Sequence, residues 1–530
     1  MVRQLRHGMA WGAVAVMVAL LHPLRERIAP EGVNLLAEPP ALRGAIGLLE
    51  LLLVAAVFSR GGFRLLLPSP WRLLLLAWFA ATTLSVIAAD FLLMALMRQM
   101  EWLLHGAAAL ALWRLLGETP GGRERFRTVV MVALLLAMVM LVAGWLAVPD
   151  PEAYNWLQNV VGFVHLRFLG VFLVLGLPFY LAPWLGGGDG RPPAGGRRVW
   201  GAERWLGFAA AVAALGGLAW AAGRGPYLAL LITTPLLVAL RLVPFRAAGL
   251  LLAAAVLGAV ISMPFWDDAT GDTSTGLDRF VPQLGGGLDA RLGTPLHQLA
   301  TGRDLLWGAA WQAFLERPLP GWGPDGYRQV PLPGVDPRIQ PLHPHNGLLQ
   351  LLVEWGVAGT VLFTVLLIGW LRSAVRHLRG RERPDGVQLA ALWSLLIGLV
   401  LSLVSGTLYH PWPLMFLSFC VAVASPLGGA RESASAGRWR WLVAGGAVLA
   451  ALPLVAHLRV AYLVQHPTLS PASPQAREAR WVRHFPSWVA SYPFQINVAR
   501  WLNTWEQEGV AMGDWRRWYL ARRYHGGPLE

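Results

Sequence analysis

The chain has 530 residues, of which 55% are hydrophobic and only 14% charged, and its mean hydropathy is +0.49. Soluble globular domains carry about 25% charged residues, so this composition excludes a soluble domain and predicts a chain that lies mostly within a membrane. The formal net charge of +14 comes from arginine, because the sequence contains no lysine. The arginines are spread between apolar stretches, which favours a role in membrane orientation over nucleic-acid binding.

Apolar stretches of about 18 residues, long enough to cross the hydrocarbon core of a bilayer as helices, follow one another along most of the chain. Helices satisfy their own backbone hydrogen bonds in lipid. We therefore expect an all-α polytopic membrane protein, a bundle of about 13 transmembrane helices with one long outer loop. The predicted helices span residues 9–22, 44–59, 71–89, 91–114, 127–148, 167–185, 204–222, 226–243, 246–264, 345–371, 387–408, 411–428 and 440–458.

Arginine is concentrated in alternate gaps between these helices, which predicts that those gaps and the N-terminus face the cytoplasm. The first apolar stretch lacks a small-residue cleavage site, so we expect a retained anchor rather than a signal peptide. Tryptophans and arginines mix in the tail, which favours amphipathic helices that lie on the membrane or pack on the outer loop. The predicted parts are residues 1–264 with helices one to nine, the outer loop 265–344 with short helices, residues 345–458 with helices ten to thirteen, and the outer tail 459–530.

The outer loop is long and rich in glycine and proline, and long loops on a rigid scaffold are where functional residues concentrate. Thr301 is typical of a helix cap, and the apolar spacing after it predicts a helix from Arg303 to Arg317 that Pro318 ends. A cation in the first turn, such as Arg303, opposes the helix dipole. Local conflicts of this kind are expected at functional sites, which makes Arg303 a candidate anion-binding residue.

Arg224 lies in a Gly-Arg-Gly-Pro hairpin between two predicted membrane helices, and Pro226 suits the first turn of the second helix. Arg224 would therefore project at a helix N-terminus, where free N–H groups and the helix dipole favour an anion. Because this position lies on the predicted outer side, we expect Arg224 to bind a lipid-linked phosphate. The alternative is an arginine that only contacts lipid headgroups. Arg303 would complete a clamp for a diphosphate. Arg279 and Arg291 in the outer loop are further candidates.

His343, His345 and Asn346 stand immediately before a predicted membrane helix. Histidine titrates near neutral pH and is the usual general base for an attacking hydroxyl. His345 is therefore a candidate base with His343 and Asn346 as supporting residues; a capping or interfacial histidine is the alternative. We predict no metal site, because no cysteine and no clear third ligand accompany the histidines. The adjacent acids Asp267 and Asp268 are more typical of a solvated loop than of a metal-binding pair.

Glu354 lies about 13 Å further along the same predicted helix, at a rise of 1.5 Å per residue. A carboxylate at that depth must be paired, neutral or turned toward a polar cavity. Glu354 is therefore either a functional residue or the structural partner of an arginine such as Arg98. Gly356 and Gly359 predict a position where another helix approaches closely.

Three segments resemble motifs of the O-antigen ligase and O-antigen polymerase superfamily, in the order of that family, over roughly residues 204–371. They are the hairpin Gly223-Arg224-Gly225, the stretch from Arg303 through Trp307, Trp311 and Pro318-Leu319-Pro320-Gly321-Trp322-Gly323, and His345-Asn346 followed after nine residues by Gly356-Val357-Ala358-Gly359.

This resemblance implies a metal-independent, inverting glycosyltransferase of the bacterial inner membrane with its active site on the periplasmic side. The donor would be a glycan on undecaprenyl pyrophosphate, and the acceptor the lipid A core, another glycan or a protein. His345 would activate the acceptor hydroxyl, while Arg224 and Arg303 would bind the pyrophosphate. No cofactor is expected, because the glycosyl pyrophosphate is already activated. Membrane lipids are expected partners, and nucleic acid is not.

Among the acceptors we favour ligation to the lipid A core, with polymerisation next. The outer tail 459–530 departs from the ligase pattern, which strengthens the alternative of a protein O-oligosaccharyltransferase. The alternative from another class is a lipid-linked-glycan transporter, which needs charges along a path across the bilayer. Arg98, Glu101 and His105 share one predicted helix, but the other notable polar groups gather at the outer side.

Overall fold

The structure is a computed structural model, and most of the bundle lies within the part of the chain that it describes. It describes residues 2–21, 40–58, 63–65, 69–90, 92–148, 156, 160, 163, 166–186, 197–266, 303–330, 343–380, 385–426 and 430–432. Several predictions fall outside these residues: the helix over 440–458, the tail over 459–530, the pair Asp267 and Asp268, and the arginines Arg279 and Arg291.

The described chain is helical apart from one short pair of strands. The elements are α1 (Val2–Ala15), η1 (Val16–Leu20), α3 (Pro40–Phe58), β1 (Phe63–Leu65), α4 (Ser69–Ile87), α5 (Leu92–Glu118), α6 (Gly122–Ala147), α7 (Leu166–Leu185), α8 (Arg197–Trp220), α9 (Arg224–Ala239), α10 (Phe245–Ser262), η2 (Met263–Phe265), α14 (Arg303–Glu316), η3 (Gly326–Gln329), α15 (Gly347–Arg379), α16 (Gly386–Ser402), α17 (Pro411–Ala424) and β2 (Ala430–Glu432). The two strands pair antiparallel.

Every predicted membrane helix that falls within the described residues corresponds to a helix of the structure. Five of these, α4, α6, α7, α10 and α15, are long and apolar enough to cross a bilayer, and α9, α16 and α17 are shorter apolar helices. The chain is therefore a helical membrane protein. The number of about 13 spans stays a prediction.

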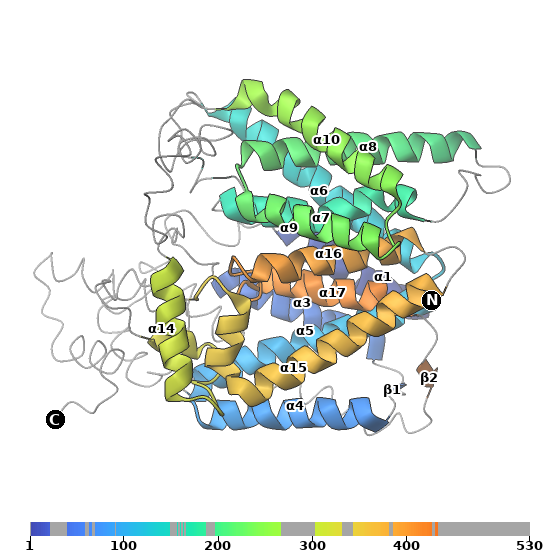
Figure 1. The fold of residues 1–530 in the computed structure, drawn as a ribbon. Coiled ribbons are helices and arrows are strands. Elements are labelled where there is room, and N and C mark those ends of the chain that lie inside the picture. Colours follow the sequence, from blue (N-terminus) through green and yellow to red (C-terminus); the bar gives the residue numbers. More distant parts are fainter. Residues whose placement is uncertain are drawn as a thin grey trace, which may run out of the picture.

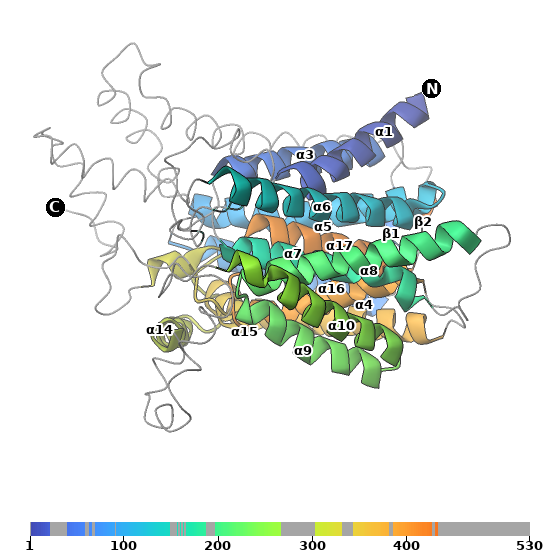
Figure 2. The same ribbon diagram turned by 90° about the horizontal axis from the view of Figure 1, so that it is seen from above.

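The bundle helices run in one general direction, and α14 lies across one end of the bundle (Figure 1). A view turned by 90° shows α14 almost end-on, so it runs across the bundle (Figure 2). Inside the bundle, α8 packs against α7 and α10, and α16 packs against α7, α9 and α17. The N-terminus lies at the opposite end from α14, which belongs to the predicted outer loop. We therefore refer to the end covered by α14 as the outer end.

The helix α15 is broken at Gly356, whose φ of 64° and ψ of −173° are not helical. Its first half, residues 347–355, packs against α14 through Leu349 and Val353. Its second half, residues 357–379, continues as a long bundle helix (Figure 1). The helix predicted over residues 345–371 is therefore present but interrupted at Gly356. Glu354 lies two residues before this break.

The break in α15 is filled by the turn over residues 318–322, which follows α14. Val357 donates its backbone N–H to the carbonyl of Pro318 at 2.8 Å, and Trp322 donates to the carbonyl of Val353 at 2.8 Å. The turn thus pairs with backbone groups that the broken helix leaves without intrahelical partners. We call this arrangement of residues 318–322 and 353–357 the α15 joint.

Glycine is required on both sides of the α15 joint because the two backbones nearly touch. A Cβ atom on Gly356 would lie 2.0 Å from the carbonyl oxygen of Leu319, and one on Gly321 would lie 2.6 Å from that of Glu354. Both glycines also have φ values near +65° to +70°, which favour a residue without a Cβ. The prediction that Gly356 admits another helix is therefore wrong, because the approaching backbone belongs to a turn.

A second difference concerns α16, which ends at Ser402 although the apolar pattern predicts a helix to residue 408. Residues 403–410 instead form a loop to α17 at the outer end, and Ser405 and Thr407 bond to each other through their hydroxyls at 2.6 Å. Small polar residues around Gly406 favour a turn over a helix, which explains the early end. We call residues 403–410 the α16–α17 loop.

Candidate active site

The turn from His343 to Asn346 joins the outer loop to α15 and fixes the backbone of His345. His345 has a φ of 53°, a left-handed value that costs a non-glycine residue about 1–3 kcal/mol unless neighbours support it. Its N–H donates to Nδ1 of His343 at 3.3 Å. The Asn346 side chain caps α15 by accepting the N–H of Leu349 at 3.1 Å. His345 is only partly buried.

The helix α14 ties this turn to the outer end of the bundle. Trp307 of α14 donates its indole N–H to the carbonyl of Pro344 at 3.0 Å. The rings of His343 and His345 meet edge to face with centroids 4.2 Å apart. The position of His345 is therefore set by α14 on one side and by His343 on the other.

Three arginines stand at the first turns of three different helices. Arg224 is the first residue of α9, Arg303 is the first residue of α14, and Arg167 is the second residue of α7. The first turn of a helix has free N–H groups and the positive end of the helix dipole. Each arginine thus adds a formal charge to a position that already favours an anion.

Arg303 interacts electrostatically with Arg167 and Arg224, and His345 interacts with Arg303 and Arg167. The pKa of Arg303 lies below its usual value because the side chain is buried and because the charges of Arg167 and Arg224 oppose its own. Burial, followed by the charges of Arg303 and Arg167, lowers the pKa of His345 to about 4. Since charges interact this strongly only over short distances, the three arginines and His345 form one positively charged site.

The structure therefore brings together the three main candidates from the sequence: Arg224, Arg303 and His345. Glu354 lies at the α15 joint, where its carboxylate accepts the side-chain N–H of Gln350 at 3.1 Å. Arg98, the partner considered for Glu354, forms its ion pair with Glu101. Within the described ranges, no group of three or more histidines, cysteines or acids is placed to hold a metal ion.

Sequence reasoning missed two residues of this region, Arg167 and Tyr409. The position of Arg167 at the start of a predicted helix, at the outer end, could have indicated an anion-binding residue. Arg167 lacks, however, the glycine hairpin that distinguishes Arg224. Tyr409 belongs to the α16–α17 loop, and its ring centroid lies 4.7 Å from that of His343. The apolar pattern gave no indication of this loop, so no local signal pointed to Tyr409.

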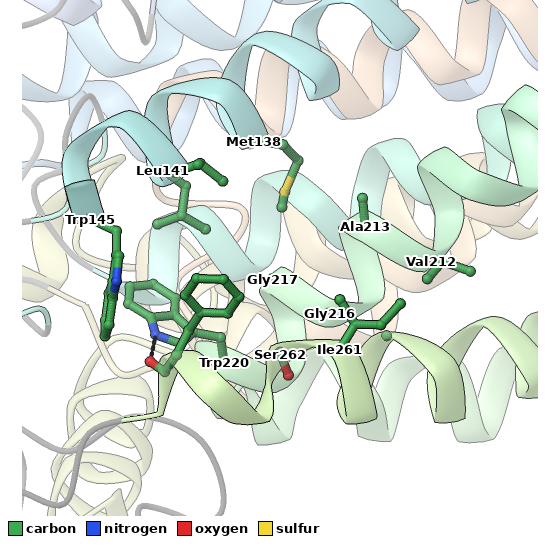
Figure 3. A pocket seen from close by; sticks show the side chains of 13 residues that line it. Met138, Leu141, Trp145, Val212, Ala213, Gly216, Gly217, Trp220, Ile261 and Ser262 are labelled. Carbon is green, nitrogen blue, oxygen red and sulfur yellow. Dashed lines mark hydrogen bonds between the residues drawn. The ribbon is translucent and has the colours of Figure 1, made fainter.

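An apolar cavity of about 220 Å³ lies between the outer halves of α6, α8 and α10 (Figure 3). Trp145 and Trp220 stand near its outer end, where the indole N–H of Trp220 donates to the carbonyl of Phe265 at 2.8 Å. Val142 and Ile261 line the cavity and are 49% and 60% exposed. The cavity therefore borders the lipid-facing surface of the bundle.

Residues 209–364 match the family model described as O-antigen ligase. The matched segment runs from α8 into α15 and contains Arg224, Arg303 and His345. Residues 209–364 form a domain of the O-antigen ligase and polymerase superfamily. No curated protein matches it. This match, together with the long apolar helices, supports a glycosyltransferase-like membrane enzyme. Arg167 and Tyr409 lie outside the matched segment, which therefore contains only part of the site.

Proposed function

We propose that this superfamily member transfers a glycan from undecaprenyl pyrophosphate to an acceptor hydroxyl at the periplasmic face of the bacterial inner membrane. The preferred acceptor is the lipid A core. The observation that carries the proposal is the set of Arg167, Arg224 and Arg303 at three helix N-termini, linked through the charge of Arg303, with the partly buried His345 next to the charges of Arg303 and Arg167. A diphosphate leaving group needs positive charge, an attacking hydroxyl needs a base, and this site offers both.

In the proposed reaction, His345 takes the proton of the acceptor hydroxyl as its oxygen attacks the anomeric carbon. The bond from that carbon to the pyrophosphate oxygen breaks, and the undecaprenyl pyrophosphate leaves with the bonding electron pair. The arginines stabilise the negative charge that builds up on the leaving group. Attack from the face opposite the leaving group inverts the anomeric centre. The arginine charge makes the transfer independent of a divalent metal.

The low pKa of His345 gives donor binding a second role. In the free site, burial and the charges of Arg303 and Arg167 disfavour a protonated His345, which makes it a weak base. A bound pyrophosphate would offset these cations and raise the pKa of His345 toward its ordinary value of about 6.5. His345 would then become an effective base only once the donor is bound. Without a bound donor, His345 would remove the proton of the acceptor hydroxyl less readily.

The apolar cavity supports a lipid-linked donor over a soluble one. Its lining residues come from the outer halves of three bundle helices, and its exposed side faces lipid. Trp220 stands only four residues before Arg224, at the same end of the bundle. We propose that part of the isoprenoid chain lies in this cavity while the pyrophosphate occupies the arginine site.

The transporter alternative is less well supported. Arg98, Glu101 and His105 on α5 form a buried polar group with Glu50, in which His105 and Glu50 lie 2.6 Å apart. Toward the inner end, α5 next buries the apolar residues Ala108, Ala111, Leu112 and Leu115. Within the described part of α5, the charges thus do not continue in an unbroken line from one membrane face to the other, as a transport path requires.

Polymerisation and protein glycosylation use the same donor and the same base, so the site supports them equally. They differ only in the acceptor. A polymerase would extend a second lipid-linked glycan, and a protein O-oligosaccharyltransferase would modify a serine or threonine hydroxyl. The choice among the three acceptors therefore depends on a reaction test with defined substrates.

The test combines purified protein with undecaprenyl-pyrophosphate glycan and lipid A core in the absence of divalent metal. Glycosylated lipid A core on a gel is the expected product, and the His345→Ala variant should form none. His7→Ala is the matched control, since His7 pairs with Glu118 at the inner end. Longer lipid-linked glycans would identify a polymerase instead. Unchanged substrates would disprove ligation, and an active His345→Ala variant would disprove the proposed base.

A further inference from the structure

The imidazole of His343 is enclosed on all sides. The rings of His345, Tyr409 and His410 surround it with centroid distances of 4.2, 4.7 and 5.3 Å. The backbone of Gly406 covers a further side, because a Cβ atom there would lie 2.3 Å from Cε1 of His343. Only 7% of His343 is exposed. Its ring therefore has no room to rotate while the α16–α17 loop stays in place.

The hydrogen bond from His345 to His343 requires a neutral imidazole. Nδ1 of His343 accepts the backbone N–H of His345, so this nitrogen carries no proton. Burial lowers the pKa of His343 well below its usual value, and the positive charges around it act in the same direction. These charges belong to His345, His410, Arg328 and Arg98. His343 is thus kept in the form that can hold the His345 backbone at its left-handed φ.

Tyr409 is fixed by three arginines from different parts of the chain. Its carbonyl oxygen accepts from Nη2 of Arg98 at 2.8 Å and from Nη2 of Arg43 at 3.1 Å. Its hydroxyl accepts from Arg328. The three guanidinium carbons lie 5.3 Å (Arg43), 5.4 Å (Arg98) and 5.8 Å (Arg328) from the centroid of its ring. Backbone, ring and hydroxyl of Tyr409 are therefore all held.

The arginines are in turn held by the partly buried Glu101 and the buried Asp325. Glu101 pairs with both Arg98 and Arg43, and Asp325 pairs with Arg328 at 3.0 Å. Buried ion pairs with several hydrogen bonds have few alternative arrangements, because moving one charge leaves another without compensation. The network therefore gives the α16–α17 loop a rigid attachment to α3, α5 and the segment after α14.

We propose that the α16–α17 loop is a positioning element for the base: Gly406 and Tyr409 hold the ring of His343, and His343 holds the backbone of His345. This inference rests on the proposed function, in which His345 is the base. Tyr409 and Gly406 do not touch the reacting atoms. They act by keeping the imidazole of His345 at the place where the acceptor hydroxyl and the arginine site meet.

Two variants loosen this arrangement from opposite sides. Gly406→Ala pushes against the His343 ring, and Tyr409→Leu removes the ring that supports it. Both should lower kcat about 10- to 100-fold, the usual effect of a displacement of about 1 Å in a catalytic group. KM for the donor should change less than about twofold, because the three arginines of the site are intact. Tyr409→Phe keeps the ring and should lose less activity than Tyr409→Leu.

Matched controls separate positioning from a general loss of stability. Tyr180→Leu removes a similarly buried tyrosine whose hydroxyl donates to the carbonyl of Met131, in the half of α7 away from Arg167. Gly249→Ala adds a methyl group to α10 where nothing lies within 4 Å. Both controls should keep wild-type kcat. Should Tyr409→Leu fail to fold in thermal melts, Gly406→Ala decides the question.

A readout that needs no activity is the modification of His345 by diethyl pyrocarbonate, which reacts with unprotonated imidazole and is located by mass spectrometry. In the wild type the reaction should be slow, with a midpoint near pH 4. In Gly406→Ala and Tyr409→Leu, water reaches His345, so the rate should rise and the midpoint should move toward about pH 6.5. Arg303 and Arg167, the charged residues that act on His345, are not altered in either variant.

The two readouts distinguish the two proposals. If both variants match the wild type in kcat and in the pH midpoint of His345, the positioning role is wrong, whatever reaction the wild type performs. If the midpoint shifts but the wild type transfers no glycan, the positioning role stands and the proposed function fails. If kcat falls equally in Tyr409→Phe and His345→Ala, Tyr409 acts through its hydroxyl, which would also overturn the proposal.

Discussion

At the scale of single residues, the pKa of His345 connects donor binding to base catalysis. A base must be unprotonated, so activity falls as the pH drops through its pKa. We expect the acid limb of kcat/KM, which reports the free enzyme, to lie near pH 4. The acid limb of kcat should lie higher, toward about pH 6.5, because the bound pyrophosphate offsets Arg303 and Arg167. Initial rates from below pH 4 up to pH 8 test this, and identical limbs would contradict it.

Arg167 provides a second prediction at this scale. Arg167→Gln removes one of the three positive charges from the site, and a hydrogen bond to a charged group contributes about 1.5–3 kcal/mol. We expect kcat/KM for the donor to fall about 10- to 100-fold. Arg204→Gln is the matched control, because Arg204 lies on α8 with its guanidinium 4.9 Å from the ring of Trp184, near the inner end. Equal effects of both variants would exclude a specific role for Arg167.

The sequence was sufficient for those site residues whose local context is unusual. Arg224 stands in a glycine hairpin, Arg303 opposes a helix dipole, and His345 precedes a long apolar stretch. Arg167 and Tyr409 have ordinary neighbours in the sequence. Their importance comes from contacts with residues far away along the chain, as in the bond between Arg98 and Tyr409, and no local pattern encodes such contacts.

At the scale of secondary-structure elements, the α15 joint depends on two glycines. Gly356→Ala places a methyl group 2.0 Å from the carbonyl oxygen of Leu319 and imposes a left-handed φ on alanine. We expect the free energy of unfolding to fall by at least about 2 kcal/mol and transfer activity to fall with it. Gly249→Ala, on an open face of α10, should be neutral or stabilising by up to about 1 kcal/mol. Thermal melts in detergent compare the two, and a wild-type Tm for Gly356→Ala would refute the required close contact.

Hydropathy predicted the bundle helices because burial in lipid demands long apolar stretches. It did not predict where helices break. The residues on both sides of Gly356 are apolar, so the pattern continues across a position where the backbone turns. The early end of α16 was missed for the same reason. Apolar composition indicates that a segment lies in lipid or in the protein interior. The position of a turn depends instead on a few backbone contacts.

At the scale of the whole molecule, the apolar cavity lies at the same end of the bundle as the arginine site. Ala213→Trp should fill part of the cavity, which Ala213 lines (Figure 3). If the isoprenoid chain of the donor lies there, KM should rise about tenfold for a long-chain donor and stay unchanged for a donor with a short chain. Leu252→Trp, at a lipid-facing position of α10 that is 67% exposed, is the control. Equal KM changes for both donors would show that the chain binds elsewhere.

The α15 joint has a consequence for exchanging parts between relatives of this protein. The turn over 318–322 and the helix break over 353–357 are separated by some thirty residues of sequence, yet their backbones interlock. A chimaera that takes the outer loop from one parent and α15 from another would combine two halves of the joint that were never matched. Swaps intended to change the acceptor should therefore carry both segments from one parent, with the boundary placed beyond Val357.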